Sequence, residues 1–365
     1  ISNKPLAEIS NTAFYNNKCY AGLKEADTKN WIFGSIFSLV EVDQSTLAYR
    51  YILNVDTNSV ASDIVFQNTG AKLYCYYLSF KIGLKKIYLQ KIIIDKNSII
   101  RDSVLINLPI NQTGNDSWHD FELYKSKIVI INNELFSKII YLNDSATKVV
   151  LNIQNYDTTL TAVWNCDLKS ADAWIYSNNN KTVIYYALGQ GKLNIKIFDK
   201  ASFTFTDATN PILDIIPFTY GRFEFIHWNA KDYMVIVNDS DNDKIIDNTY
   251  LFSFITDSTF QLERTFSGGR KVHCFNQNDS LIYFALGKDS VNYLSFYDTS
   301  FSLINIGRIK NNKNGNRVQI NNYASQGLEY WYFGNYFISP NYYPYAIKTT
   351  TPLFVKNGSQ VTPPN

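Results

Sequence analysis

The sequence predicts an all-β fold built from repeated units, and three observations support this. The segment Lys181–Lys196 recurs 98 residues later as Asp279–Leu294, with IYYALG at Ile184–Gly189 matching IYFALG at Ile282–Gly287. Aromatic residues are abundant, with 27 Tyr, 24 Phe and 6 Trp, and they favour half-buried strands together with Ile and Val. Clusters of Asn, Gly and Asp separate the strand-forming runs, whereas helical periodicity with caps is hard to find.

Runs of strand-forming residues follow one another at intervals of about 50 residues. We interpret each run as the second of four strands in a unit, and 365 residues would hold seven units of about 52 residues. The third unit is then expected at about 118–155 and the fourth at about 160–208. Besides a weaker run around Cys19, the runs are Leu73–Leu78, Ile128–Ile131, Val183–Leu188, Tyr233–Val237, Leu281–Leu286 and Leu328–Phe333.

Several of these runs are apolar on both faces, as Leu328–Phe333 illustrates, which is typical of a strand packed between two neighbouring sheets. The whole chain resembles a seven-bladed β-propeller of four-stranded antiparallel blades. Six or eight blades also fit, because the first unit is the least regular. The repeated marks of WD-type and kelch repeats are missing, so the resemblance implies a fold without a specific function. The expected domains are an N-terminal extension at 1–10, the propeller at 11–356 and a Thr/Pro-containing C-terminal tail at 357–365.

Charge and hydropathy narrow the classes of partner. The net charge is +2, and Lys and Arg are interspersed with Asp and Glu, so no nucleic-acid-binding face is expected. No apolar run approaches the roughly 18 residues of a membrane span.

Four cysteines (Cys19, Cys75, Cys166 and Cys274) allow three disulfide pairings, with buried thiols as the alternative. Loss of a signal peptide is one explanation for the start at Ile1, and it predicts an extracellular or cell-surface location.

One acidic segment indicates a calcium site. It is similar to the DxDxDGxxD loop of integrin-type propellers, in which carboxylates at alternate positions converge on one cation. That resemblance implies side-chain oxygens from four aspartates and a backbone oxygen from Ile245 as ligands. Lys244 replaces the usual glycine, and the alternative is a plain acidic hairpin loop. The four aspartates are Asp239, Asp241, Asp243 and Asp247.

The only three histidines, His119, His227 and His273, all fall in expected first strands of units, and such strands line the channel of a propeller. If they converged, they would hold a transition metal or act as acid and base, assisted by Asp120 with Glu122 or by Glu224. The alternative is that they lie at different heights and share no site. Motifs such as GxSxG, HExxH and the P-loop are missing from the sequence.

Glycosylation sequons and an aromatic-rich last unit complete the candidates. The last unit, around Tyr330–Phe333 and Tyr342–Tyr345, would either stack on sugars or proteins or pack between blades. The tail has the Thr/Pro composition of an extended stalk. The sequons are at Asn111, Asn115, Asn143, Asn180, Asn238, Asn278 and Asn357, and we expect all except the last to lie in loops.

Three functions follow in order of preference. The first is a non-catalytic secreted or surface-displayed glycoprotein for adhesion or structure, with calcium as its only expected cofactor. Such a protein would assemble into a filament when a terminal segment pairs with a neighbouring molecule. The second is a polysaccharide lyase or glycoside hydrolase that binds glycans at the channel mouth, and the third is an intracellular scaffold.

Overall fold

A computed structural model of the chain contains β-strands and turns but no helix among the residues that it describes. That part of the chain therefore has no helix suited to crossing a membrane. The chain divides into two compact units, Ile1–Ala171 with Ile320–Thr350, and Asp172–Gln319 with Thr351–Asn365. The described residues are 7–26, 35–43, 46, 48–54, 59–62, 64–81, 86–96, 98–108, 126–142, 149–170, 173–188, 192–209, 220–239, 248–256, 258–267, 272–277, 280–286, 292–309, 317–326, 329–338, 341–349 and 360–361.

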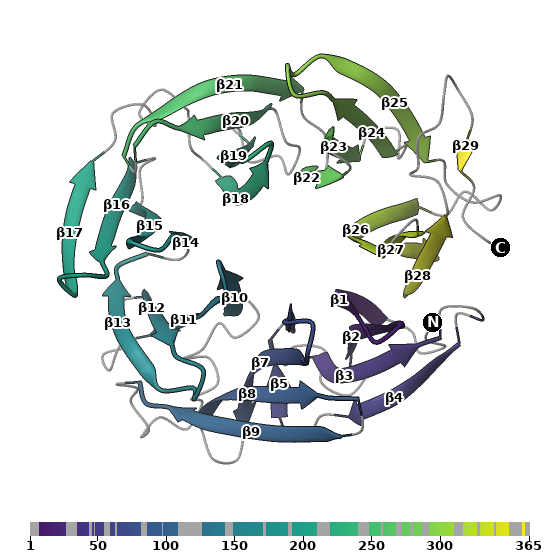
Figure 1. The fold of residues 1–365 in the computed structure, drawn as a ribbon, viewed down its shortest axis with the longest axis horizontal. Coiled ribbons are helices and arrows are strands. Elements are labelled where there is room, and N and C mark those ends of the chain that lie inside the picture. The colour runs from purple at the N-terminus through teal and green to yellow at the C-terminus, as the bar shows by residue number, and fades with distance from the viewer. Residues whose placement is uncertain are drawn as a thin grey trace. The chain divides into compact units, whose positions relative to one another are not determined.

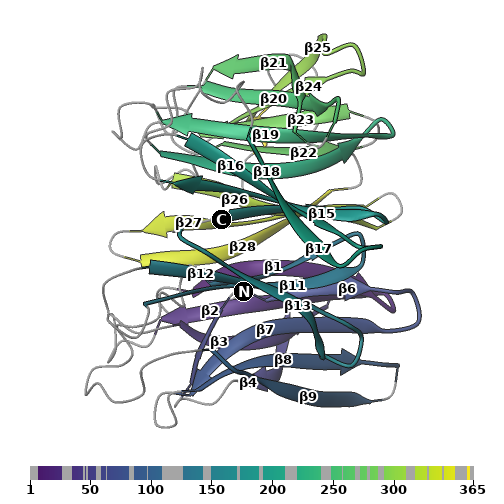
Figure 2. The same cartoon turned by 90° about the vertical axis from the view of Figure 1, so that its left-hand side faces the viewer.

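The first unit holds four antiparallel sheets whose strands pair mostly in chain order (Figure 1). Figure 2 shows this order in the second sheet, where β7, β8 and β9 follow one another. β1 lies beside β27 and β28, so the N-terminal sheet packs next to the last antiparallel strands of the chain. The strands are β1 (Ala7–Tyr15), β2 (Lys18–Ala26), β3 (Ser35–Val42) and β4 (Tyr49–Asn54); β5 (Ser59–Ala61), β6 (Val65–Asn68), β7 (Leu73–Lys81), β8 (Lys86–Ile94) and β9 (Ile99–Ile106); β10 (Lys127–Ile131), β11 (Glu134–Leu142), β12 (Val149–Tyr156) and β13 (Ala162–Leu168); and β26 (Arg317–Gln326), β27 (Glu329–Ile338) and β28 (Asn341–Thr349).

The second unit holds three more sheets of the same design. The last of them gains a fifth strand, β29, which pairs in parallel with the outer strand β25. The strands are β14 (Ala173–Ser177), β15 (Lys181–Leu188), β16 (Lys192–Asp199) and β17 (Thr204–Thr209); β18 (Tyr220–Trp228), β19 (Lys231–Asp239), β20 (Asn248–Phe254) and β21 (Phe260–Ser267); and β22 (Val272–Gln277), β23 (Ser280–Leu286), β24 (Asn292–Tyr297), β25 (Leu303–Ile309) and β29 (Gln360–Val361).

Second strands are buried on both faces, as the two-sided apolar runs predicted. In β7, Tyr76 packs into a core shared with the following sheet, whereas its neighbour Tyr77 packs into a core shared with the preceding sheet. In β19, Met234 and Val235 divide in the same way between two cores. Each sheet therefore shields the apolar face of the next one within its unit.

The strand order confirms most expected units but corrects the third and fourth. Ile128–Ile131 belongs to the first strand of its sheet, not the second, and Ala162–Leu168 is the fourth strand of that sheet. The third sheet therefore runs from β10 to β13, and the fourth begins only at Ala173. Polar residues in β12 and β13 interrupt the apolar alternation, so the sequence does not show which of the four strands each segment of the third unit forms.

The chain ends also carry strands. β1 begins at Ala7, inside the segment expected as an N-terminal extension, and β29 lies inside the expected tail. The expected fourth strand of the last unit, Pro352–Val355, lies outside the described residues. No described sheet combines strands from both ends of the chain.

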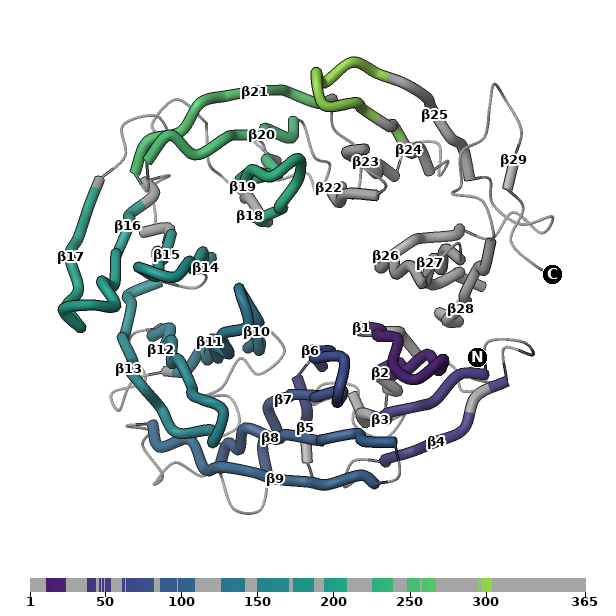
Figure 3. Tube along the Cα trace, viewed as in Figure 1, coloured from purple at the N-terminus to yellow at the C-terminus, as the bar shows by residue number. Residues whose placement is uncertain are grey.

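One turn repeats where third strands join fourth strands (Figure 3). At Asp157–Thr161 and Asp298–Ser302, the aspartate Oδ1 accepts hydrogen bonds from backbone N–H groups two and four residues further on. Asp199 makes a similar turn with one extra residue. In each turn an apolar residue takes a left-handed backbone: φ is 65° at Leu160, 56° at Phe203 and 59° at Phe301.

Candidate functional site

His227 forms a polar cluster in the second unit, together with Asp232 and Tyr176. β18 and β19 are joined by Asn229 and Ala230, whose φ angles of 51° and 55° are typical of a type I′ hairpin turn. The register of this hairpin places His227 directly opposite Asp232. The sequence therefore positions the pair by strand pairing alone.

Asp232 joins two sheets. Its Oδ1 lies 2.7 Å from Nδ1 of His227, and its Oδ2 accepts a hydrogen bond of 2.8 Å from the hydroxyl of Tyr176 in β14. The His227 side chain is 70% exposed and that of Asp232 is 37% exposed. A carboxylate that orients an imidazole is also a common arrangement around a catalytic general base.

The aromatic side of the cluster fixes Tyr176. Its ring stacks on Phe254 at a centroid distance of 4.9 Å and lies 6.1 Å from Phe225. Burial, followed by the hydrogen bond and the charge of Asp232, raises the pKa of Tyr176. Tyr176 therefore stays protonated at neutral pH and donates to Asp232.

His227 and His273 do not share a position along their strands. His227 is the second-last residue of β18, whereas His273 is the second residue of β22, the first strand of the next sheet. His119 lies outside the described residues, as do Asp120 and Glu122, and the side chain of Glu224 is not described. A shared histidine site stays a prediction that the positions of His227 and His273 do not favour.

The expected calcium loop follows β19, and only its first residue, Asp239, has a described backbone. Asn238, directly before it, is 1% exposed, and its Oδ1 has no hydrogen-bond partner among the residues that the structure describes. An unpaired amide oxygen is a suitable calcium ligand, so this residue fits a cation at the start of the loop. Asp241, Asp243, Lys244, Ile245 and Asp247 lie outside the described residues, within which no group of three metal-binding side chains occurs.

Two of the seven sequon asparagines, Asn180 and Asn238, lie in the described part of the chain. Asn180 is exposed in the turn between β14 and β15, as expected for a loop sequon. Asn238 lies in β19 and is buried, so its expected loop position is wrong, and a glycan could not be accommodated there without displacing the strand. The remaining five, Asn111, Asn115, Asn143, Asn278 and Asn357, lie outside the described residues.

Of the two alternatives for the cysteines, the described part of the chain shows thiols: Cys19, Cys75 and Cys166 form no disulfide. The side chain of Cys274 lies outside that part. Cys19 and Cys75 are completely buried. Burial raises the pKa of Cys19 to about 12 and raises the pKa of Cys75 further, so neither is a reactive thiolate at neutral pH.

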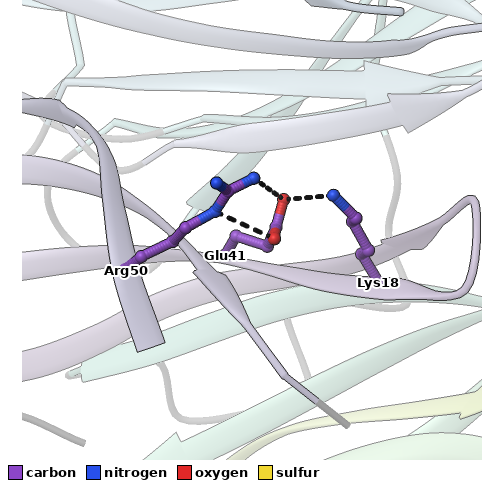
Figure 4. Close-up of polar contacts among 3 residues, drawn as sticks. All are labelled: Lys18, Glu41 and Arg50. Carbon is purple, nitrogen blue, oxygen red and sulfur yellow. Dashed lines mark hydrogen bonds and ion pairs between the residues drawn. The ribbon is translucent and has the colours of Figure 1, made fainter. Parts of the chain in front are cut away.

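A second charged cluster lies on the first sheet (Figure 4). Glu41 in β3 accepts hydrogen bonds from Lys18 at 3.0 Å and from Arg50 at 3.0 and 3.1 Å. Burial alone would raise the pKa of Glu41, but the hydrogen bonds and charges of Arg50 and Lys18 outweigh it and lower that pKa. Because both cations bind the same carboxylate, the cluster joins three strands and keeps a single net positive charge at the surface.

Sequence reasoning identified His227 but missed Asp232 and Tyr176. Asp232 had a signal, because a two-residue turn between the expected strands would place it opposite His227. Tyr176 had none, since it comes from another sheet 56 residues away in sequence. The repeated turn was missed as well, although YDTTLT at Tyr156–Thr161 and YDTSFS at Tyr297–Ser302 mark it clearly.

No protein-family model and no curated protein matches the chain. Several solved structures match most of it. An acylaminoacyl peptidase of Pyrococcus horikoshii has a TM-score of 0.54 at 9% identity, covering 93% of this chain and 52% of that one. The β-propeller domain of the Trilobed protease from Pyrococcus furiosus has a TM-score of 0.53 at 9% identity, covering 98% of both chains. A prolyl endopeptidase has a TM-score of 0.53 at 8% identity, covering 94% of this chain and 50% of that one.

These likenesses, together with the four-stranded antiparallel sheets, show that the fold is a β-propeller. They do not set the number of blades, which stays a prediction. The chain spans about half the length of the two peptidases named above. At identities of 8 to 9%, the likeness concerns the fold alone.

Proposed function

We propose that the chain is a non-catalytic, secreted or surface-displayed β-propeller module that binds partners by strand addition at its outer sheet edges. The observation that carries this proposal is the parallel pairing of β29 with β25, in register Arg308 to Gln360 and Ile309 to Val361. A segment distant in sequence thus extends the outer edge of a sheet. The same geometry would serve between molecules, in adhesion or in a filament.

The physical basis is the unpaired backbone of an outer strand. One row of its N–H and C=O groups is open to an added strand, whose backbone hydrogen bonds supply affinity while its alternate side chains fix register and partner. The tail that carries β29 contains one Thr and two Pro, and the paired prolines favour an extended form. Such a segment is well suited to add to an edge.

The proposed location outside the cell is supported by the exposed sequon at Asn180. We expect intact-mass measurement of natural material to show added sugar at this site. Natural protein with an unmodified mass throughout would contradict the secreted assignment.

The peptidase likeness supports a related form of the proposal. The Trilobed protease contains a β-propeller domain, and this chain covers only about half the length of the acylaminoacyl peptidase and of the prolyl endopeptidase. The module would then be one lobe of a longer protein whose chemistry lies elsewhere. Sequencing the complete natural transcript distinguishes a free-standing module from such a lobe.

Strand addition is tested with a variant that lacks residues 357–365 and so leaves the edge of β25 open. We expect this variant to bind a synthetic peptide of residues 357–365, measured by fluorescence anisotropy, and to ignore a scrambled peptide of the same composition. The full chain should bind the peptide more weakly, because its own tail competes. Equal binding of both peptides, or of neither, would refute the proposed role of this edge.

A glycan-cleaving enzyme is the second candidate, and the His227–Asp232 pair is the observation that favours it. The test compares the rates at which the native chain and the His227→Ala variant degrade each polysaccharide of a panel. Loss of a measured activity in the variant would replace the non-catalytic proposal, whereas unchanged turnover would remove His227 as a catalytic residue.

A further inference from the structure

β9, the outer strand of the second sheet, exposes three large apolar side chains: Ile99, Ile100 and Leu105 are 46%, 50% and 37% exposed. Among the side chains that the structure describes in the other outer strands, one of this kind is exposed in each of β4, β13, β21 and β25: Tyr51, Val163, Leu262 and Leu303 respectively. Clustered exposure of this kind marks an interaction site more often than isolated apolar residues do.

The exposed residues lie on an open edge. β8 is the only strand that pairs with β9 among the described residues, so the opposite row of backbone groups in β9 has no partner strand there. The equivalent edge of the sheet that ends in β25 is partly covered by β29. An added strand is therefore the kind of partner that this fold already accepts.

The sequence of β9 suits a second copy of itself. In a two-fold antiparallel pair, opposite residues must point to the same side of the sheet, so a residue pairs with one an even number of positions away. A register centred on Asp102 places Ile99 opposite Leu105 of the other copy, and Ile100 opposite Val104. Each of the three exposed apolar side chains then has an apolar cross-strand partner, and Arg101 lies opposite Ser103.

The same register sets one cost, because Asp102 lies opposite Asp102 of the second copy. Like charges directly across a strand pair are unfavourable. Within the molecule, Lys91 is the residue opposite Asp102 in β8, but its Nζ donates to the backbone oxygen of Thr158 and lies near Asp157. A central charge on an edge strand commonly limits self-pairing, and here it would keep the association weak and reversible.

We infer that β9 is a self-association edge through which two copies of this chain pair antiparallel about Asp102, with Asp102 restraining the contact. The inference rests on the proposed use of outer edges for strand addition, and it names the partner as a second copy. A single strand pair buries little surface compared with a standard interface, so association should appear only at high micromolar concentration or above.

Sedimentation equilibrium of the full chain over a concentration series tests this inference. We expect Asp102→Asn to strengthen dimerisation about fivefold, since removing two like charges about 5 Å apart relieves a repulsion of that size in water. Ile100→Asp should weaken it more than tenfold, because it removes the apolar pair with Val104 and adds a like charge beside Asp102 on the same face of each strand. Leu262→Asp, at an equally exposed position on the outer strand β21, is the matched control and should leave dimerisation unchanged.

The outcomes separate the two proposals. A monomer at every concentration in both the native chain and Asp102→Asn would overturn the inference about β9, as would equal effects of Ile100→Asp and Leu262→Asp. Binding of the 357–365 peptide to the shortened variant is independent of β9, so that result would leave the general proposal standing. Circular dichroism and thermal unfolding of each variant verify that it is folded.

Discussion

At the scale of single residues, the repeated turn shows how burial offsets backbone strain. A left-handed φ is unfavourable for residues other than glycine, at a cost of about 1 kcal/mol or more. Leu160 accepts it while being only 2% exposed in the core that the second and third sheets share. Phe301 does the same against Trp228 and Tyr233 of the preceding sheet. These turns therefore attach one sheet to the next.

Leu160→Ala tests this attachment. The substitution removes a buried side chain and leaves a cavity, so we expect it to lower the free energy of unfolding by about 2–5 kcal/mol. Phe203→Ala is the matched control, because Phe203 occupies the equivalent left-handed position but is 64% exposed. Urea unfolding should show a change of at most about 0.5 kcal/mol for the control. Equal losses in both variants would mean that the turn itself, and not the burial of Leu160, matters.

Glu41 gives a prediction about pH. Its pKa is lowered in the fold, so the stability that it contributes is present above the unfolded carboxyl pKa of about 4.3 and is lost as the pH falls through the lower folded pKa. We expect Glu41→Gln to cost about 1 kcal/mol at pH 7 and nothing measurable in strong acid, because its partners are largely exposed. Urea unfolding at pH 7, 5 and 3 measures this. A cost that stays constant with pH would show that Glu41 acts by packing instead of charge.

At the scale of elements, β12 carries a polar ladder inside a largely apolar core. Tyr156 donates to Gln154, Gln154 donates to Asn152, and Asn152 donates to Asp167 in β13. Ser137 in β11 lies 3.0 Å from the Tyr156 hydroxyl. A buried ladder of this kind favours one strand register, because a shift would leave its polar groups unpaired.

Tyr156→Phe interrupts the ladder at its buried end. We expect a loss of about 1–3 kcal/mol, since the side chains of Gln154 and Ser137 lose a partner away from water. Tyr76→Phe is the comparison, because Tyr76 is equally buried and its hydroxyl makes no hydrogen bond with the described residues. The difference between the two variants in urea unfolding isolates the hydrogen bonds. A similar loss in both would assign the effect to the hydroxyl volume.

This ladder also explains where sequence reasoning failed. The apolar runs at Leu73–Leu78 and Tyr233–Val237 were correctly expected as second strands, because both of their faces are buried. Around β12 and β13, buried Asn and Gln break the apolar alternation, and the strands of the third unit were therefore assigned to the wrong positions in their sheet. The YDTTLT turn would have restored it, since it marks the step from third to fourth strand.

At the scale of the whole molecule, a fold of this type could be predicted from its repeats, but its site could not. The recurrence of IYYALG and IYFALG marks equivalent second strands, β15 and β23, and therefore the unit itself. Contacts between sheets follow no sequence period, so the bridge from Asp232 to Tyr176 had no signal. β29 pairs with β25 over only two residue pairs, and the strand propensity of the sequence does not predict so short a pairing.

Calcium binding is a prediction for the whole molecule, because a ligand that binds only the folded chain raises its overall stability. At a concentration 100 times the dissociation constant, one bound calcium would add about 2.7 kcal/mol. We expect calcium to raise the thermal unfolding temperature and EDTA to reverse the change. The carboxylates at Asp241 and Asp243 and the unpaired oxygen of Asn238 are the expected source of this response.

Two variants and one competing ion make that measurement specific. Asp241→Asn and Asp243→Asn should each reduce the calcium response, because they remove ligand charge, while leaving the unfolding temperature in EDTA nearly unchanged. Magnesium should act more weakly, because it holds its water and demands a stricter octahedral geometry. An unfolding temperature that calcium does not change in the native chain would make the segment a plain acidic loop, and the unpaired oxygen of Asn238 would then need another partner, such as an ordered water.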